Sequence, residues 1–306
     1  MPSRPFREDT EFLRAESIAG HLIMILSASR RTDIPACYSQ WFMNRLQAGF
    51  LLTRNPFNAA QVRRVGLSRE EIDCIVLWTK DPAPMLPALD ALDAFGCPYY
   101  FQFTLTPYDA RIERNLRPKE DIVKTFVTLG KRLGRSRVFW RYDPVIVNDT
   151  FSVEDHFRAF TALCARLCDS TESVTISFVD VYRKLKTPLI REITQDEIAQ
   201  ISAAFSRTAG EHGLSIRACC EQTGLSSYGI RPASCIDLET IERLCGRRIA
   251  AGPDKNQRPG CGCVASVDIG AYNTCKNGCV YCYATANTAA ASTRYARHDP
   301  AGEFLA

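Results

Sequence analysis

Short apolar runs alternate with longer amphipathic stretches between residue 22 and about residue 218, and this alternation is the strongest constraint on the fold. Each apolar run is about six residues long and rich in Ile, Val, Phe and Tyr, as is typical of buried strands. We therefore expect six strands, at Leu22–Ala28, Ile72–Trp78, Tyr99–Leu105, Val138–Arg141, Val174–Val179 and Leu214–Ala218.

The intervening stretches have the pattern of helices. We expect them at Cys37–Ala48, Pro84–Phe95, Lys119–Leu133, Ser152–Cys168 and Gln195–His212, with a capping box formed by Thr194 and Glu197 and a short hairpin within residues 50–70. Strands that alternate with helices imply parallel pairing, in either an open doubly wound sheet or a barrel-like ring. Both place chemistry at the carboxyl ends of the strands.

Polar and charged side chains follow all six expected strands. Solvated loop residues are the simpler interpretation of any one such cluster, but six at corresponding positions favour a shared polar pocket. The candidates for this pocket, which we treat as catalytic, are Arg31, Asp33, Lys80, Arg141, Asp143 and Glu221.

Cysteine is unusually abundant, with 14 among 306 residues against four histidines, and residues 219–282 hold nine of the 14. Acidic residues in the first twenty positions match neither a secretory signal nor a transit peptide, so we expect a cytoplasmic protein with no membrane partner. In that compartment, clustered thiols are more often metal ligands than disulfides. The net charge of +4 is too small to indicate nucleic-acid binding, which stays allowed but unsupported.

Three of these cysteines, Cys275, Cys279 and Cys282, have the spacing CxxxCxxC. The dipeptide Asn277-Gly278 between them favours a tight turn. Zinc ribbons use paired CxxC motifs about 15–20 residues apart, which this segment lacks. Three thiolates on one loop suit a 4Fe-4S cluster, which takes one thiolate per iron and would keep one iron open.

This motif resembles that of the radical S-adenosylmethionine (SAM) enzymes, in which an aromatic residue precedes the third cysteine. The resemblance implies a 4Fe-4S cluster that binds SAM at its open iron and releases a 5′-deoxyadenosyl radical after receiving an electron. It also implies that Tyr281 packs near the adenine, and Asp268, on the expected strand before the loop, is our second cofactor-binding candidate. A reductant such as flavodoxin or ferredoxin would then be a partner, together with a substrate that the sequence does not identify.

Nearly the whole chain resembles the bacterial domain-of-unknown-function family 1848, from Ser27–Pro35 through Trp78–Lys80 and Arg141–Pro144 to Cys282–Ala284. Thr79-Lys80 and Arg141–Pro144 are also loosely similar to barrel segments of spore photoproduct lyase. In radical SAM enzymes the three-cysteine loop normally follows the first barrel strand, whereas here it follows all six strand–helix units. A circular permutation would reconcile the two, with Val264–Ile269 as the first strand in space.

We therefore expect an α/β fold: a partial (β/α)6-type parallel barrel that is similar to the radical SAM barrel and circularly permuted. It would comprise an N-terminal extension (1–21), a strand–helix repeat region (22–218) and a cysteine-rich segment that completes the barrel (219–306). A second cysteine group, Cys219, Cys235, Cys261 and Cys263, would hold an auxiliary iron–sulfur cluster or a structural zinc, or consist of ordinary buried thiols. Cys220 could replace Cys219.

The expected function is that of a radical SAM-type enzyme acting on an unknown substrate. The alternative is a non-enzymatic module, stabilised by an iron–sulfur cluster or zinc, that binds a partner such as nucleic acid. An open iron position distinguishes the two, because a purely structural site needs all its ligands from the protein.

Overall fold

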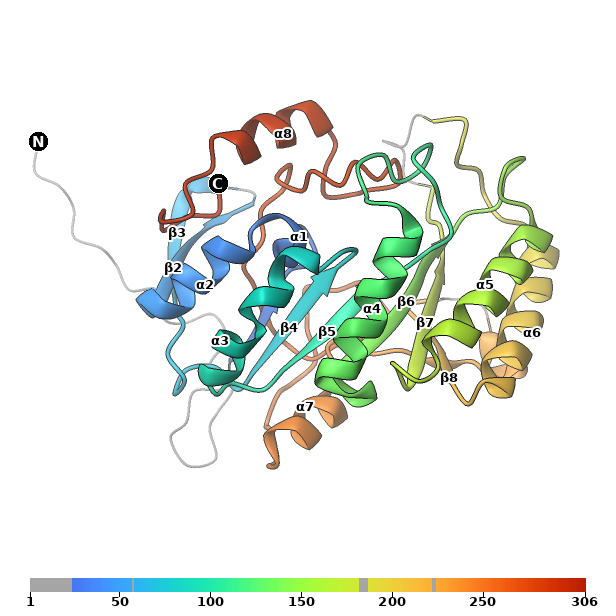
Figure 1. The fold of residues 1–306 in the computed structure, drawn as a ribbon, viewed down its shortest axis with the longest axis horizontal. Helices are drawn as coiled ribbons and strands as arrows, with labels where there is room; N and C mark the ends of the chain where they lie inside the picture. Colours follow the sequence, from blue (N-terminus) through green and yellow to red (C-terminus); the bar gives the residue numbers. More distant parts are fainter. Residues whose placement is uncertain (1–23, 57, 182–186, 222–223) are drawn as a thin grey trace, which may run out of the picture.

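The computed structural model describes residues 24–56, 58–181, 187–221 and 224–306. Its centre is an eight-stranded sheet in which every pair is parallel. The strands lie in the order β10 (Val267–Asp268), β1 (Ile25–Ala28), β4 (Cys74–Thr79), β5 (Tyr99–Thr104), β6 (Val138–Val145), β7 (Ser173–Phe178), β8 (Ser215–Ala218) and β9 (Arg231–Pro232) (Figure 1). In the described residues β10 and β9 are the two edges of the sheet, so the fold is an open partial barrel, as expected.

The helices largely follow the predicted stretches. They are α1 (Ile34–Cys37), α2 (Ser39–Ala48), α3 (Leu89–Ala94), α4 (Lys119–Leu133), α5 (Val153–Leu167), α6 (Gln195–Glu211), α7 (Leu238–Cys245) and α8 (Thr288–Ala296), with 3₁₀ turns at Ala83–Ala88, Arg135–Arg137 and Leu225–Tyr228. The predicted helix at Cys37–Ala48 starts earlier and is interrupted at Tyr38. The predicted helix at Pro84–Phe95 begins as a 3₁₀ turn that contains Pro87, which cannot donate a helical hydrogen bond. The capping box of Thr194 and Glu197 is present at the start of α6.

A two-stranded antiparallel hairpin, β2 (Phe50–Asn55) and β3 (Asn58–Gly66), fills the segment where a hairpin was predicted. The sequence did not predict α7, α8 or β9. These elements lie in the cysteine-rich part of the chain; of the three, α7 has apolar residues at helical spacing, Leu238, Ile241 and Leu244, that could have revealed it. In the described residues, no helix is long and apolar enough to cross a bilayer.

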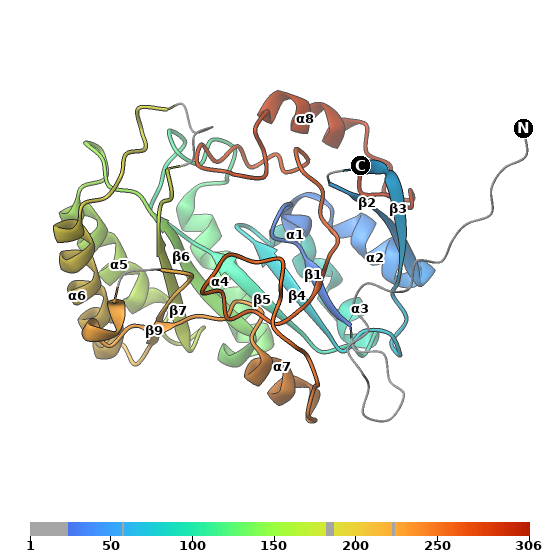
Figure 2. The same cartoon turned by 180° about the vertical axis from the view of Figure 1, so that it is seen from behind.

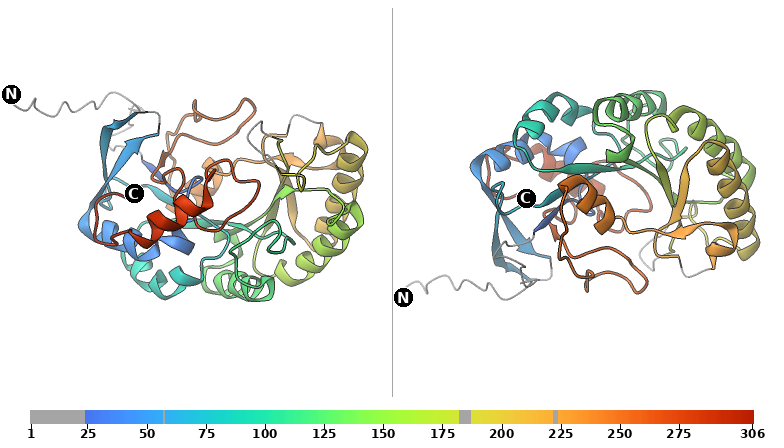
Figure 3. Two further views of the ribbon diagram at one scale, coloured as in Figure 1. Left: turned by 90° about the horizontal axis from the view of Figure 1, so that it is seen from above. Right: turned by 90° about the horizontal axis from the view of Figure 1, so that it is seen from below.

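The two faces of the sheet differ in polarity. Side chains alternate between the faces along each strand, so Phe101, Phe103 and Trp140 pack into the main core with the helices, while Gln102 and Arg141 face the other way. Seen along the strands, the sheet forms an open arc with helices along its outer side (Figure 3). The chain after α7 runs across the inner face (Figure 2).

The last strand in the sequence lies beside the first. β10 pairs with β1 in parallel, with Val267 opposite Leu26 and Asp268 opposite Ser27. The strand expected at Val264–Ile269 is therefore present but reduced to two residues. Because the strands are parallel, the segment that follows β10 emerges at the same edge as the turns that follow β1, β4 and β5.

Candidate functional site

The loop that carries Cys275, Cys279 and Cys282, here called the loop thiols, is attached to the carboxyl ends of the neighbouring strands. The Tyr38 hydroxyl donates to the Thr274 carbonyl at 2.8 Å, and Asn277 Nδ2 donates to Asp33 Oδ2 at 2.9 Å. Val280 N donates to the Ile112 carbonyl at 2.9 Å, beside an antiparallel bridge between Glu113 and Cys279. Contacts to the segments after β1 and β5 thus fix the backbone on both sides of Cys279.

The loop thiols form one electrostatically connected group. Cys279 interacts with Cys282 and Cys275, and Cys282 interacts with Cys275. Burial raises the pKa of Cys279, and the nearby Lys80 ammonium opposes that effect. Cys275 also interacts with Cys37, a buried thiol at the end of α1. The structure therefore brings the three predicted ligands together on one side of the sheet.

A buried carboxylate lies against this loop. Glu113 Oε1 accepts from Lys80 Nζ at 2.7 Å, from Tyr281 Oη at 2.5 Å and from Thr106 Oγ1 at 3.0 Å, and Oε2 accepts from Lys119 Nζ. Burial alone would raise the pKa of Glu113, but the two ammonium groups outweigh burial and lower it to about 2. Glu113 is thus an anion held between two lysines.

The sequence analysis missed Glu113 and Lys119. Glu113 lies in a loop after β5 that has no recognisable motif, and Lys119, at the start of α4, has the pattern of an ordinary helix residue. Lys80 was a candidate, and its interaction with Cys279 places it beside the loop thiols.

Asp33 joins three segments. It caps α1 by accepting from Ala36 N at 3.0 Å, and its other oxygen accepts from Lys80 N at 2.7 Å as well as from Asn277. Burial raises the pKa of Asp33 to about 6 despite these donors. These contacts indicate that Asp33 positions the loop.

The two cofactor-binding candidates, Tyr281 and Asp268, have different surroundings. Tyr281 packs beside Tyr108 and Lys80, with its hydroxyl on Glu113. The Asp268 carboxylate accepts from Ser29 Oγ at 2.6 Å, Ser27 Oγ at 3.1 Å, Arg30 N at 2.9 Å and Gly270 N at 3.0 Å. These four donors occupy its oxygens and tie β10 to the turn after β1.

Arg31 extends beyond this framework. Its guanidinium lies 3.8 Å from Asp268 and 5.3 Å from the centre of the Tyr272 ring, and its side chain is 28% exposed. Tyr272 and Tyr283 are among the large apolar side chains that stay exposed in the described residues. Tyr283 also donates to the Arg30 carbonyl at 2.9 Å. This rim therefore combines a cation with two aromatic rings next to the loop.

A second group of thiols lies on the inner face of the sheet. We call it the strand-end thiols; its members are Cys219, Cys220, Cys235, Cys261 and Cys263. Cys219 Sγ and Cys235 Sγ are 3.5 Å apart, and the side chains interact in the pairs Cys235 and Cys263, Cys263 and Cys261, Cys261 and Cys220, and Cys220 and Cys219. The four cysteines predicted as a second group converge in space, together with Cys220, in a closed ring of contacts.

Two arginines reach the strand-end thiols. Arg141 Nη1 donates to Cys235 Sγ at 2.6 Å, and Arg30 hydrogen-bonds Cys263. Trp78 lies between them, with ring-centre distances of 5.4 Å to Arg30 and 5.3 Å to Arg141. Hydrogen bonds from the other thiols and from Arg141 lower the pKa of Cys219.

The remaining pocket candidates lie near this second group. Asp143 pairs with Arg141 and accepts from Ser177 Oγ. Glu221 accepts from Phe178 N at 2.9 Å, and burial raises the pKa of its carboxyl to about 7. The six candidates thus divide between the two thiol groups: Asp33, Lys80 and Arg31 adjoin the loop, and Arg141, Asp143 and Glu221 adjoin the strand-end thiols.

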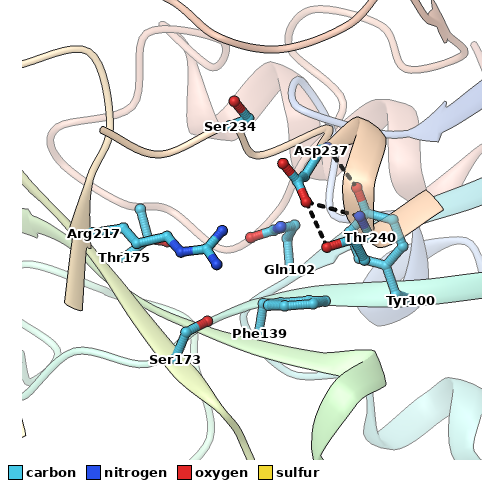
Figure 4. Close-up of a pocket in the computed structure, with 9 residues that line it drawn as sticks. All are labelled: Tyr100, Gln102, Phe139, Ser173, Thr175, Arg217, Ser234, Asp237 and Thr240. Atoms are coloured by element: carbon cyan, nitrogen blue, oxygen red, sulfur yellow. Dashed lines mark hydrogen bonds between the residues drawn. The ribbon is translucent and has the colours of Figure 1, made fainter. Parts of the chain in front are cut away.

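In the described part of the chain, no group of three or more His, Cys, Asp or Glu side chains is arranged so that it could hold a metal ion as it stands. A small cavity lies on the inner face of the sheet between Gln102, Arg217 and Asp237 (Figure 4). Its volume of ≈ 10 Å³ is about enough for one water molecule, so it does not offer room for a substrate.

Fold and thiol groups together define an α/β partial-barrel protein with a cysteine-rich carboxyl-terminal segment. The chain belongs to the family described as domain of unknown function DUF1848, whose model matches residues 25–284. No curated protein matches it.

Solved structures show only distant likeness. One is a candidate alpha-L-fucosidase from Bacteroides thetaiotaomicron VPI-5482, with 11% identity, coverage of 96% of this chain and 98% of that chain, and a TM-score of 0.28. Another is a short-chain type dehydrogenase/reductase from Mycobacterium marinum, with 6% identity, coverage of 65% and 73%, and a TM-score of 0.23. Both likenesses are too weak to indicate a function.

Proposed function

We propose that this protein is a radical SAM-type iron–sulfur enzyme with Cys275, Cys279 and Cys282 as the three cluster ligands. The observation that carries the proposal is the position of the loop thiols, which follow a strand paired with β1 and lie at the carboxyl edge of a parallel partial barrel. That edge is where barrel folds place their chemistry.

The donor set fits a 4Fe-4S cluster with an open iron. Three thiols from one loop lie together, and the nearest charged cluster, Lys80–Glu113–Lys119, has two cations for one anion. Within this cluster the Lys80 ammonium favours the thiolate form of Cys279. When bound, such a cluster supplies the electron for reductive cleavage of SAM.

The chain's own residues orient and enclose this site. Asp33 and Asn277 hold the loop against the turns after β1 and β4, and Glu113 fixes the ring of Tyr281 beside Lys80. Arg31 is the partly exposed cation on the rim, and we assign to it the binding of a carboxylate from SAM or an anionic substrate. Tyr272 and Tyr283 offer aromatic faces for a base or another planar group.

The test is anaerobic reconstitution with iron and sulfide, followed by SAM and dithionite, with chromatographic measurement of 5′-deoxyadenosine. We expect product from the native chain and none from Cys279→Ala. Cys168→Ala is the matched control, because that half-buried cysteine lies at the end of α5, outside both thiol groups. A reconstituted cluster that gives no SAM cleavage would contradict the proposal and favour a non-enzymatic binding module.

A further inference from the structure

The strand-end thiols are assembled from three separate parts of the chain. Cys219 and Cys220 follow β8, Cys235 precedes α7, and Cys261 and Cys263 lie in the segment that crosses the inner face before β10. Chance would scatter cysteines that lie up to 44 positions apart in the sequence. Five thiols that form a closed ring of contacts instead indicate a common ligand.

The backbone around these thiols is held by groups that leave the sulfurs facing one another. The Cys235 carbonyl accepts from Gln102 Nε2 at 2.8 Å and from Tyr100 Oη at 3.0 Å. Ile236 N donates to Cys263 Sγ at 3.3 Å. Donors of this kind orient metal-bound thiolates in structural sites.

The separation of Cys219 Sγ and Cys235 Sγ favours a single small ion. Four thiolates at about 2.3 Å from a tetrahedral zinc lie about 3.8 Å from one another. The 3.5 Å separation of Cys219 Sγ and Cys235 Sγ is close to that value. In a 4Fe-4S cluster each thiolate binds a different iron, and the sulfurs are held further apart.

The surrounding charge fits the same ion. Four thiolates and one zinc carry two excess negative charges, which a buried site must offset. Two guanidinium groups reach the thiols: that of Arg141, whose side chain is only 6% exposed and which also pairs with Asp143, and that of Arg30, which lies 3.7 Å from Asp254. In the described residues, Nη2 of Arg30 is buried without a hydrogen-bond partner, so one donor is still available.

We propose that Cys219, Cys235, Cys261 and Cys263 bind one zinc ion in a closed tetrahedral site, separate from the loop thiols. The ion joins the end of β8 to the segment that crosses the inner face and leads into β10. Cys220, whose backbone has the left-handed φ of 53°, contacts the ligands without being one of them. The site does not depend on the radical function proposed above.

The first experiment measures metal in the full chain purified without added metal. We expect about one zinc per chain by mass spectrometry, retained in Cys220→Ser and in the control Cys168→Ser, and lost in Cys235→Ser and Cys261→Ser. Loss of zinc from Cys220→Ser with retention in Cys261→Ser would overturn the ligand assignment. The triple variant Cys275→Ser, Cys279→Ser, Cys282→Ser should lose its iron and keep its zinc, so that failure of either proposal is separable from failure of the other.

The second experiment needs no variant, so it stays informative if the substitutions prevent folding. Cobalt(II) added to the metal-stripped native chain should give the strong visible absorption of a tetrahedral tetrathiolate site, at one equivalent. A cobalt spectrum of octahedral type, a Cys219–Cys235 disulfide in protein kept under reducing conditions, or about four irons retained by the loop triple variant would each overturn the zinc site.

Discussion

The loop thiols and the strand-end thiols are both rich in cysteine, yet they are built in opposite ways. The loop thiols come from eight consecutive residues and rely on their neighbours, Asp33, Asn277 and Glu113, to hold the backbone. The strand-end thiols come from three distant segments, and their sulfurs contact one another directly. A local loop can present ligands toward an open side, whereas a ring assembled from several segments encloses whatever it binds.

The charges beside the two groups follow the same division. The loop adjoins a mixed cluster in which Glu113 is shared by two lysines, together with Arg31 on the exposed rim. Buried Arg141 and Arg30 flank the strand-end thiols. A partly exposed cation at the rim of the loop suits exchange of a ligand, whereas the buried cations beside the strand-end thiols, which also contact Asp143 and Asp254, suit a permanent anionic site.

The largest effect should come from Arg141. Arg141→Gln removes a buried cation from Asp143 and from the strand-end thiols, so we expect about 3–5 kcal/mol less unfolding free energy and loss of zinc. Urea denaturation and metal analysis measure both. The control is Arg207→Gln, which removes an exposed ion pair on α6. It should change the unfolding free energy by no more than about 0.5 kcal/mol. If Arg141→Gln also removed the iron of the loop, the two groups would not be independent.

Glu113 should give the next largest effect, and on the other group. Its folded pKa of about 2 lies below the ordinary 4.5, so its contribution is complete above pH 4.5 and is lost as the pH falls toward 2. At pH 7, Glu113→Gln should cost roughly 3 kcal/mol, the equivalent of that pKa difference. Urea midpoints at pH 7 and pH 3 test this.

The difference between native chain and Glu113→Gln should shrink at pH 3, because the native carboxylate is then losing its advantage. Other carboxylates titrate in both proteins and cancel in the difference. A difference that is the same at pH 7 and pH 3 would show that Glu113 does not stabilise the fold as an anion.

A smaller effect is expected from Asn277, which donates to the buried Asp33. Asn277→Ala should cost about 1–2 kcal/mol at pH 8, where Asp33 is charged, and less at pH 5, below its pKa of about 6. Reconstituted iron should fall while zinc stays unchanged. Equal losses of both metals would remove the distinction between the two groups.

Features of the structure that depend on residues close together in the sequence were predicted best. The boundaries of α4 were predicted to the residue, because Pro118 and Gly134 mark its ends. The loop thiols were recognisable because their spacing is local. β10 is only two residues long, and it was predicted as a longer strand because the apolar pattern extends beyond the part that pairs.

Residues brought together from distant segments were harder to predict. Cys219, Cys235, Cys261 and Cys263 could be counted as a set of four, but the sequence does not say that Arg30 and Arg141 approach them from two strands separated by β4 and β5. Glu113 was missed because its importance comes from Lys80, Lys119 and Tyr281, which lie elsewhere in the chain. In each case the sequence shows the type of residue but not the residues that it contacts in the fold.

The smallest effect on stability, and the sharpest on ligand binding, is expected at Arg31. Its side chain is partly exposed and its distance to Asp268 is 3.8 Å, so Arg31→Gln should change the unfolding free energy by less than about 1 kcal/mol. If Arg31 binds a carboxylate at the rim, the same substitution should weaken SAM binding about tenfold, as for a loss of about 1.4 kcal/mol. Equilibrium binding of SAM to the reconstituted protein measures this, with Arg158→Gln, an exposed arginine on α5, as control. Unchanged affinity for SAM would show that Arg31 does not bind the carboxylate. A large loss of stability would show instead that Arg31 helps Asp268 to hold β10 against the turn after β1.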